Sequence, residues 1–561
     1  MSATPQGYFS FVLHSHIPYV RLAGRWPHGE EMIHEVLSET YIPLLEALYD
    51  LKAAGITPHL SIGLTPILLE QLADPDVLLH FEAYAQERLE LANGDVARFT
   101  DEGDTRRATI ARFYAAWYQR ILTAFIDRFD RDVVGAFRRL QGAGDIDVLT
   151  SAATHGYLPL LRRDSTIAAQ LAIGMRTSRR HLAKVPHGVW LPECAYRPAY
   201  LDGDARFRRA GIEEHLADFN LGYFFTETHV VQGGKLIGKA AGDALGLYGA
   251  VPERELAPAD AELPFATERT ALRPYYVQAS RVAVLARDGR TGMQVWSASE
   301  GYPGDFAYRE FHKKDDVSGL QYWRVTDPSG DLGGKDYYDP EAAQLRVLAH
   351  ARHFAGLVAE LAQTPTPDGR PPLIVSAYDT ELFGHWWFEG IDWIREVLRL
   401  LADSPVVAAT TVDDYLQAYP PSVALSIPES SWGAGGTHWT WSNPQTAWMW
   451  PLIHAAESRM EGLAKVHAGA EGAMVDVLNQ AAREFLLLTA SDWPFLVTTK
   501  QARDYATSRF QQHLARFNRL CAIADSGQLS AEAHRFLTAV TDADNPFPDI
   551  DYREFAARGQ P

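Results

Sequence analysis

The sequence predicts an α/β protein with a parallel sheet, either open or closed into a barrel. Two patterns alternate along the first 420 residues. Short apolar runs have the length of buried strands, and longer stretches repeat apolar residues at helical spacing. Strands that alternate with helices are typical of parallel sheets, because each helix returns the chain to the same edge.

The expected elements follow in order from the N-terminus. The first strand is residues 8–16, in which Ser10, Val12, His14 and His16 share one face. Further strands are expected at residues 59–64, 145–150, 188–193, 221–227, 282–285, 293–296, 373–377 and 406–410. Helices are expected at residues 30–54, 165–182, 207–220 and 340–361, with Gly55 just after the first.

Three stretches fall outside this alternation. Residues 75–140 are helical throughout and too long for one barrel helix, which indicates a helical insertion. Residues 232–271 are rich in Gly, Ala and Pro, and a connection of that length is typical of a lid loop. After residue 420 only a Gly/Trp-rich loop and amphipathic helices follow. The expected domains are therefore residues 1–420 and a strand-free helical domain at 421–561.

Composition and charge exclude several classes of protein. The chain has 561 residues, of which 47% are hydrophobic and 22% charged, as in a soluble globular protein with more than one domain. A net charge of −19 argues against a nucleic-acid partner. The two cysteines, the absence of signal-peptide features and the lack of any run of ~20 apolar residues predict a cytoplasmic protein without a membrane partner.

Two predicted strand ends carry a carboxylate in the same setting. Glu193 is in line with the apolar face of residues 188–193, and Asp379 with that of residues 373–377. If those faces point into a barrel, both carboxylates reach its mouth. Such a pair suits retaining glycoside hydrolysis at a separation of about 5–5.5 Å. The alternative is that each is a structural acid, paired with arginine or capping a helix.

The His14-Ser-His16 segment at the end of the first strand has three interpretations. In the first interpretation, the histidines bind a metal together with an aspartate and a further histidine. Otherwise they bond substrate hydroxyls or a catalytic carboxylate, or they are partly buried and simply satisfied. His155, after the third strand, belongs to the same rim. Cys194 follows Glu193 and points to the opposite face, so a catalytic thiol is not expected.

Aromatic residues are the candidates for stacking on sugar rings, because an aromatic face is flat and apolar. Trp26, Trp296, Trp432 and Trp441 lie in or beside loops near the predicted rim. A packed core position is the commoner role for each. Trp432 and Trp441 are the better candidates, because their Gly and Ser neighbours offer little to pack against.

Three segments resemble the signature regions of glycoside hydrolase family 57: residues 14–18 (HSHIP), 190–196 (WLPECAY) and 378–387 (YDTELFGHWW). Segments that resemble its 1,4-α-glucan branching subgroup are residues 153–157, 295–298, 301–304, 431–433 and 490–495. The resemblance covers nearly the whole chain. The third signature is highly specific, whereas the His-x-His pattern alone is not.

The resemblance implies a distorted (β/α)7 barrel, a helical insertion and a C-terminal helical domain that helps to wall the cleft. It implies that Glu193 is the nucleophile and Asp379 the general acid/base. The substrate-binding candidates, some from the resemblance and some from position alone, are His14, His16, Trp26, His155, Tyr248, Trp296, His385, Trp432 and Trp441. Glu381 and His385 are expected to support Asp379, while Trp386 and Trp387 are expected to pack.

The activity implied is that of a retaining glucan branching enzyme without metal or cofactor. Amylose or glycogen is the expected donor and acceptor, and the expected state is a monomer or small homo-oligomer. Tyr248 is the only tyrosine of residues 233–252 and the candidate lid residue, although its neighbours depart from the family pattern.

Alternatives stay open at this point. A 4-α-glucanotransferase or an α-amylase-type hydrolase shares the fold. A metal-dependent polysaccharide deacetylase, with His14 and His16 as ligands, uses a similar barrel. A glucan-binding protein with an inactive site is the alternative that is not an enzyme.

Overall fold

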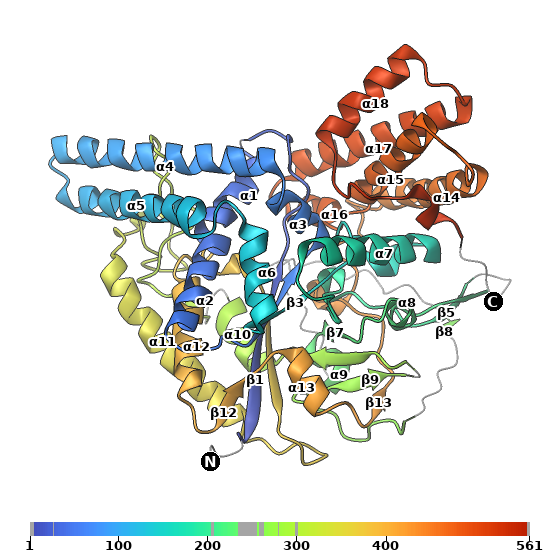
Figure 1. Cartoon of the computed structure of the whole chain (residues 1–561). Coiled ribbons are helices and arrows are strands. Elements are labelled where there is room, and N and C mark those ends of the chain that lie inside the picture. Colours follow the sequence, from blue (N-terminus) through green and yellow to red (C-terminus); the bar gives the residue numbers. More distant parts are fainter. Residues whose placement is uncertain are drawn as a thin grey trace.

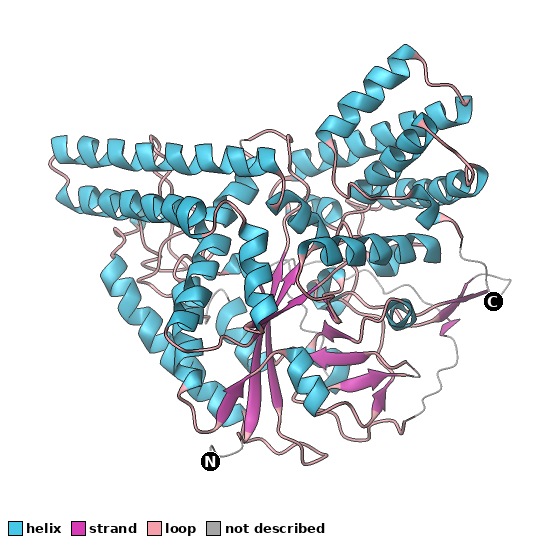
Figure 2. Cartoon of the chain, in the orientation of Figure 1, coloured by secondary structure: helices cyan, strands magenta, loops and turns pink. Residues whose placement is uncertain are grey.

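The computed structural model describes residues 5–25, 27–202, 207–233, 263–278, 280–297 and 301–557, together with the backbone of β8 (Glu255–Leu256). Strands lie in the lower centre of the molecule, with helices outside them (Figures 1 and 2). The C-terminal helices stack above one end of the strands (Figure 1).

In this part of the chain, seven parallel strands form a distorted barrel. They are β1 (Gly7–Ser15), β2 (Leu60–Leu64), β3 (Ile146–Leu149), β4 (Gly188–Val189), β7 (Tyr223–Thr226), β10 (Ala283–Ala286) and β11 (Leu373–Asp379). β11, β1, β2 and β3 pair in one run, and β4, β7 and β10 in another. A parallel bridge from Thr150 to Val189 joins the runs on one side. On the other, the Asp288 N–H donates to the Val375 carbonyl at 2.8 Å. The predicted (β/α)7 barrel is confirmed.

The alternation of side chains in β1 separates two layers. Val12 belongs to the inner core with Val189, Val375 and Ala377. The residues between the inward positions face the surrounding helices, and Phe11 packs on Trp393 of α12 at 5.8 Å. The predicted division of the first strand into two faces therefore matches two separate layers of the core.

Helices connect and cover the strands. They are α1 (Glu30–Val36), α2 (Ile42–Ala53), α3 (Pro66–Leu72), α7 (Asp164–His181), α8 (Ile212–Asp218), α9 (Thr228–Gln232), α10 (Gly289–Trp296), α11 (Pro340–Leu361), α12 (Gly390–Ala402) and α13 (Val412–Ala418). A π-helical turn, Leu37–Tyr41, joins α1 to α2. None of the helices in the described part of the chain combines the length and apolar character of a membrane span.

The helical insertion consists of α4 (Pro75–Asp101), α5 (Thr105–Thr123) and α6 (Val133–Ala143). α4 and α5 lie side by side and project from the barrel (Figure 1). Asp74 caps α4 by accepting the N–H groups of Asp76 and Val77, and Asp104 caps α5 by accepting that of Arg107.

Two expected elements are wrong. Residues 293–296 belong to α10, not to a strand, because four residues fit either period and Asp288 caps a helix by accepting the Thr291 N–H at 2.8 Å. The expected helix at 207–220 begins with β6 (Phe207–Arg209), which pairs antiparallel with β5 (Tyr200–Asp202). This pairing overrides the local helical pattern.

The C-terminal region contains α14 (Met449–Val466), α15 (Ala473–Leu488), α16 (Asp492–Thr499), α17 (Arg503–Ser526) and α18 (Ala531–Ala543). β12 (Val407–Ala409) pairs with β1 before it. The expectation that residues 421–561 hold no strand is wrong, because β13 (Ala424–Leu425) pairs with β9 (Tyr275–Val277). The division at residue 420 stays a prediction.

Candidate active site

A pocket of about 440 Å³ opens where β1 and β11 end. Side chains from the barrel, from α1 and from the C-terminal helix α16 line it. It brings together eight predicted site residues from distant parts of the chain: His14, His16, His155, Glu193, Trp296, Asp379, His385 and Trp432. Carboxyl ends of barrel strands are where active sites of such folds form.

Glu193 reaches the pocket from a turn rather than from a strand. β4 ends at Val189, and Glu193 lies in a 3-10 turn with φ 63°, a conformation that non-glycine residues seldom adopt. The expectation that strand alternation aims Glu193 is therefore wrong. The Trp432 N–H fixes this turn by donating to the Glu193 carbonyl at 3.0 Å.

Two donors hold the Glu193 carboxylate. The Trp432 indole N–H donates to Oε2 at 2.8 Å, and the Ser491 hydroxyl donates to Oε1 at 2.9 Å. The side chain is buried, with 8% of the residue exposed. Hydrogen bonds of this kind stabilise the ionised form.

Asp379 is the last residue of β11 and pairs in register with His14 of β1. Val375 and Ala377 of the same strand belong to the inner core, as expected. Asp379 lies above them and lines the pocket. Strand alternation therefore does place Asp379.

The carboxyl groups differ in electrostatic environment. Burial raises the pKa of Glu193 to about 7, although the bonds from Trp432 and Ser491 oppose the rise. Burial, and then the charges of Glu381 and Glu193, raise the pKa of Asp379 well above its ordinary value. Burial and nearby negative charge therefore favour the protonated form of Asp379, while Glu193 is the carboxyl that donors stabilise as an anion. Two carboxyls held in different surroundings suit acid and nucleophile roles.

His14 and His155 extend the hydrogen bonds of Glu193. Because the Ser491 hydroxyl donates to Glu193, it accepts from Nδ1 of His155 at 2.8 Å. Nε2 of His155 then accepts from Nε2 of His14 at 3.1 Å. Burial, and then neighbouring histidines, lower the pKa of both rings well below the ordinary value, so both are neutral.

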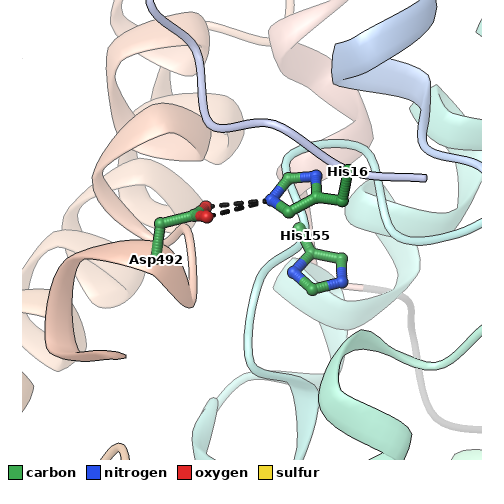
Figure 3. A group of neighbouring side chains, drawn as sticks. All are labelled: His16, His155 and Asp492. Carbon is green, nitrogen blue, oxygen red and sulfur yellow. Dashed lines mark hydrogen bonds and ion pairs between the residues drawn. The ribbon is translucent and has the colours of Figure 1, made fainter. Parts of the chain in front are cut away.

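His16 is clamped instead by Asp492 (Figure 3). Its Nε2 lies 3.1 Å from both carboxylate oxygens of Asp492, and its Nδ1 lies 3.0 Å from the Thr65 hydroxyl. Burial alone would lower the pKa of His16, but Asp492 outweighs it and raises that pKa. His16 and Asp492 thus form an ion pair at the pocket wall.

His16, His155 and Asp492 offer ligand atoms close enough for one metal ion. Their geometry fits hydrogen bonding better. The two rings stack with centroids 3.9 Å apart and planes at 21°, so their in-plane lone pairs run side by side. Two imidazoles on one zinc instead converge on it at about 2.0–2.1 Å. Nothing in this donor set favours the deacetylase alternative.

The structure also adds residues that sequence reasoning missed. Ser491 and Asp492 come from the start of α16, and the only signal in their segment is its resemblance to the branching subgroup. A Ser-Asp pair before a helix is usually a cap, so local pattern did not mark it as functional. The Tyr41 hydroxyl bonds Glu381, and burial raises the pKa of Glu381 to about 7.

The tryptophan predictions had mixed outcomes. Trp296 and Trp432 line the pocket, although Trp432 packs on Trp190 at 5.1 Å despite its small neighbours. Trp441 is fully buried and stacks on Tyr157 at 4.6 Å, so its prediction as a substrate contact is wrong. Trp26 and Tyr248 lie outside the described residues.

The segment after Asp379 contradicts one further expectation. Trp387 is 1% exposed and packs, as expected. Trp386 does not pack inside: it is 44% exposed and lines the pocket. Nδ1 of His385 lies 3.0 Å from Oε2 of Glu39, which holds the imidazole at the pocket edge.

Comparison with known proteins identifies the family. Residues 10–428 match the sequence model of glycosyl hydrolase family 57, and residues 452–555 match that of the 1,4-alpha-glucan branching enzyme C-terminal region. The chain belongs to glycoside hydrolase family 57. The family model spans the barrel and its insertion, and the second model spans the helices that supply Ser491 and Asp492.

Several relatives are similar over nearly the full length. The 1,4-alpha-glucan branching enzyme TK1436 of Thermococcus kodakarensis is 42% identical, over 99% of this chain and 79% of that protein. Its crystal structure has a TM-score of 0.88 at 41% identity, covering 99% of this chain and 98% of that one. The alpha-amylase AmyC of Thermotoga maritima has a TM-score of 0.81 at 29% identity, covering 99% of both chains.

Proposed function

We propose that this chain is a 1,4-α-glucan branching enzyme, with Glu193 as nucleophile and Asp379 as general acid/base. The similarity to TK1436 supports the activity. The observation that carries the residue roles is that both carboxyls line one pocket, where burial favours the protonated form of Asp379 and two donors hold Glu193.

In the first step a carboxylate oxygen of Glu193 attacks the anomeric carbon of an α-1,4-glucan. The bond between that carbon and the glycosidic oxygen breaks, and Asp379 gives its proton to the departing oxygen. Trp432 and Ser491 orient the attacking carboxylate. As negative charge leaves Glu193 for the new ester, the repulsion that raises the pKa of Asp379 falls, so Asp379 ionises readily.

In the second step Asp379 acts as a base. It takes the proton of a 6-hydroxyl on another glucan chain, and that oxygen attacks the anomeric carbon. The ester bond breaks, Glu193 returns as a carboxylate, and an α-1,6 branch results. Two inversions give net retention. Every step uses side chains of this chain, so no metal or cofactor enters the proposal.

The wider setting is also proposed. Cys194 and Cys521 are buried and form no disulfide, which supports a reducing, cytoplasmic location. The proposed formation of α-1,6 branches would place the enzyme in glycogen biosynthesis. We propose amylose or glycogen as donor and acceptor, and a monomer or small homo-oligomer as the working state.

Hydrolysis is the second candidate, because the alpha-amylase AmyC shares the fold over the full length. Incubation with amylose, followed by isoamylase digestion and chain profiling, separates the two. Branching gives new short chains that isoamylase releases, with few new reducing ends before digestion. Rising reducing ends without released chains would favour hydrolysis. Glu193→Gln and Asp379→Asn should each lose at least ~10³-fold in rate.

A further inference from the structure

Trp386 stands out among the aromatic residues of the pocket. It is 44% exposed, whereas Trp432 is 3% exposed and Trp296 and Phe495 are half-buried. Leaving an indole in water forgoes the stabilisation that its burial would give. In a pocket that lies beside two catalytic carboxyls, an exposed indole is the surface that a ligand covers.

Phe311 backs this indole. The two rings stack with centroids 4.3 Å apart and planes at 30°. The Phe311 carbonyl accepts from the Gln321 side-chain amide at 3.0 Å, which holds the backing ring's backbone. Because Phe311 covers one face of Trp386, the opposite face is left for a flat apolar ligand surface, such as the C–H face of a glucosyl ring.

The backbone holds Trp386 in place before any ligand binds. The Gly384 N–H donates to the Trp387 carbonyl at 2.7 Å, and the Trp386 N–H donates to the Glu381 carbonyl at 3.3 Å. Gly384 has φ +96°, and a Cβ there would lie 1.9 Å from the Glu39 carbonyl oxygen. The tight loop therefore requires glycine and pre-organises the indole, which lowers the cost of binding.

Polar groups beside the indole complete the chemistry of a sugar site. Glu35 and His385 also line the pocket, and Oε2 of Glu35 lies 3.9 Å from Nε2 of His385. A carboxylate accepts hydrogen bonds from sugar hydroxyls, and an imidazole either accepts or donates them. An apolar face flanked by such groups is typical of a site that orients a neutral polyol.

The chain connection indicates which part of the glucan binds here. The Trp432 indole N–H donates to Glu193, so Trp432 lies on the side of the pocket that holds the proposed nucleophile. Trp386 belongs to the loop that follows Asp379. The general acid/base contacts the oxygen of the leaving or arriving chain, so the sugar that carries this oxygen lies on the Asp379 side. Resting on the proposed function, we propose that Trp386, backed by Phe311, is the platform of an acceptor-side glucan subsite.

Two donors test this assignment. α-Maltosyl fluoride loads the enzyme while only fluoride leaves, whereas maltoheptaose has a leaving sugar that must occupy the acceptor side. For Trp386→Ala we expect the KM for an added maltooligosaccharide acceptor to rise about tenfold. The kcat/KM for maltosyl fluoride without acceptor should fall less than twofold. Trp386→Phe should restore most of the acceptor binding.

Trp448→Ala is the matched control. Trp448 is 39% exposed, lies outside the pocket and packs on Phe510 at 5.2 Å. Trp448→Ala should leave unchanged both the KM for the acceptor and the kcat/KM for maltosyl fluoride. If Trp386→Ala lowers kcat/KM equally for maltoheptaose and for maltosyl fluoride, the platform lies on the donor side and the proposal is overturned. No change with either donor would show that Trp386 does not bind glucan.

The test is separable from the proposed function. If the wild-type protein forms no isoamylase-sensitive branches, branching is wrong. Trp386→Ala must then still lower kcat/KM more for maltoheptaose than for maltosyl fluoride, because a hydrolase also binds the leaving chain. The absence of that difference would overturn the platform in a hydrolase as well.

Discussion

Two clusters of histidine and carboxylate share their chemistry but not their surroundings. The rim cluster is His16, His155 and Asp492, and the core cluster is Glu484, His513 and Asp544. Each brings its ligand atoms within 4.8 Å of one another. The rim cluster lines the pocket, whereas the core cluster is at most 1% exposed. The comparison shows that residue type alone does not separate a functional group from a structural one.

The core cluster ties together helices of the C-terminal region. Nδ1 of His513 on α17 lies 2.8 Å from Oε2 of Glu484 on α15. Arg516 pairs with Asp544, just after α18. Burial raises the pKa of Glu484 well above its ordinary value and lowers that of His513, so burial favours the neutral form of both groups. Sealed from water, this cluster serves stability.

In the rim cluster, the charge of Asp492 favours the protonated form of His16 at the pocket wall. Asp492 raises the pKa of His16, and the pair lines the same pocket as Glu193 and Asp379. Its role is to hold His16 at the wall of the pocket. Substitutions in the two clusters should therefore separate folding from activity.

The largest effect on stability is expected in the core cluster. His513→Ala leaves the buried Glu484 carboxyl without this hydrogen-bond partner and opens a cavity, so the free energy of unfolding should fall by ~3–5 kcal/mol. Denaturant unfolding measures this, and activity per folded molecule should stay near that of the wild type. His534→Ala on the exposed face of α18 is the control and should change stability by less than ~0.5 kcal/mol. A stable but inactive His513→Ala would contradict the division.

The rim cluster should show the opposite. Asp492→Asn removes the charge that pairs with His16, so kcat/KM on amylose should fall by up to ~10²-fold through misplacement of the ring. Stability should change little. Asp504→Asn, on the exposed first turn of α17, should leave both unchanged. If Asp492→Asn unfolds the protein but leaves kcat/KM intact, the rim cluster is structural as well.

A smaller effect concerns pH. Burial raises the pKa of Glu381 to about 7 in the folded protein, from 4.5 as its ordinary value. The folded state thus binds the proton more tightly, and this stabilisation is full below pH ~4.5 and is lost as pH rises through 7. The free energy of unfolding of the wild type should therefore fall between pH 5 and pH 8, and Glu381→Gln should make that fall smaller by up to ~2 kcal/mol. Urea unfolding at both pH values checks this, and an identical loss in both proteins would contradict it.

Much of the fold was predictable because its signals are local. The helix predicted at 340–361 coincides with α11, and Gly55 follows α2 in a left-handed conformation. Residues 293–296 misled because so short a segment fits a strand or a helix equally. The pairing of β5 with β6 depends on a contact between separate segments, which local pattern does not contain.

The candidate site was predictable only in part. Asp379 follows the alternation of β11, so pattern alone placed it. Glu193 depends on a left-handed turn that sequence alternation does not describe. Trp441 and Trp386 exchanged their expected roles, because burial is set by distant partners such as Tyr157 and Phe311. Ser491 became visible as a partner of Glu193 only when α16 was placed beside the barrel.

The most direct test of the proposed chemistry is to trap the intermediate. A 5-fluoro-α-glucosyl fluoride should load the enzyme faster than the ester is released, and digestion with mass spectrometry then locates the sugar. The account predicts one glucosyl adduct, on the peptide that contains Glu193, in the wild type and none in Glu193→Gln. A glucosyl adduct on Asp379 or Glu381 would contradict the assignment of the nucleophile.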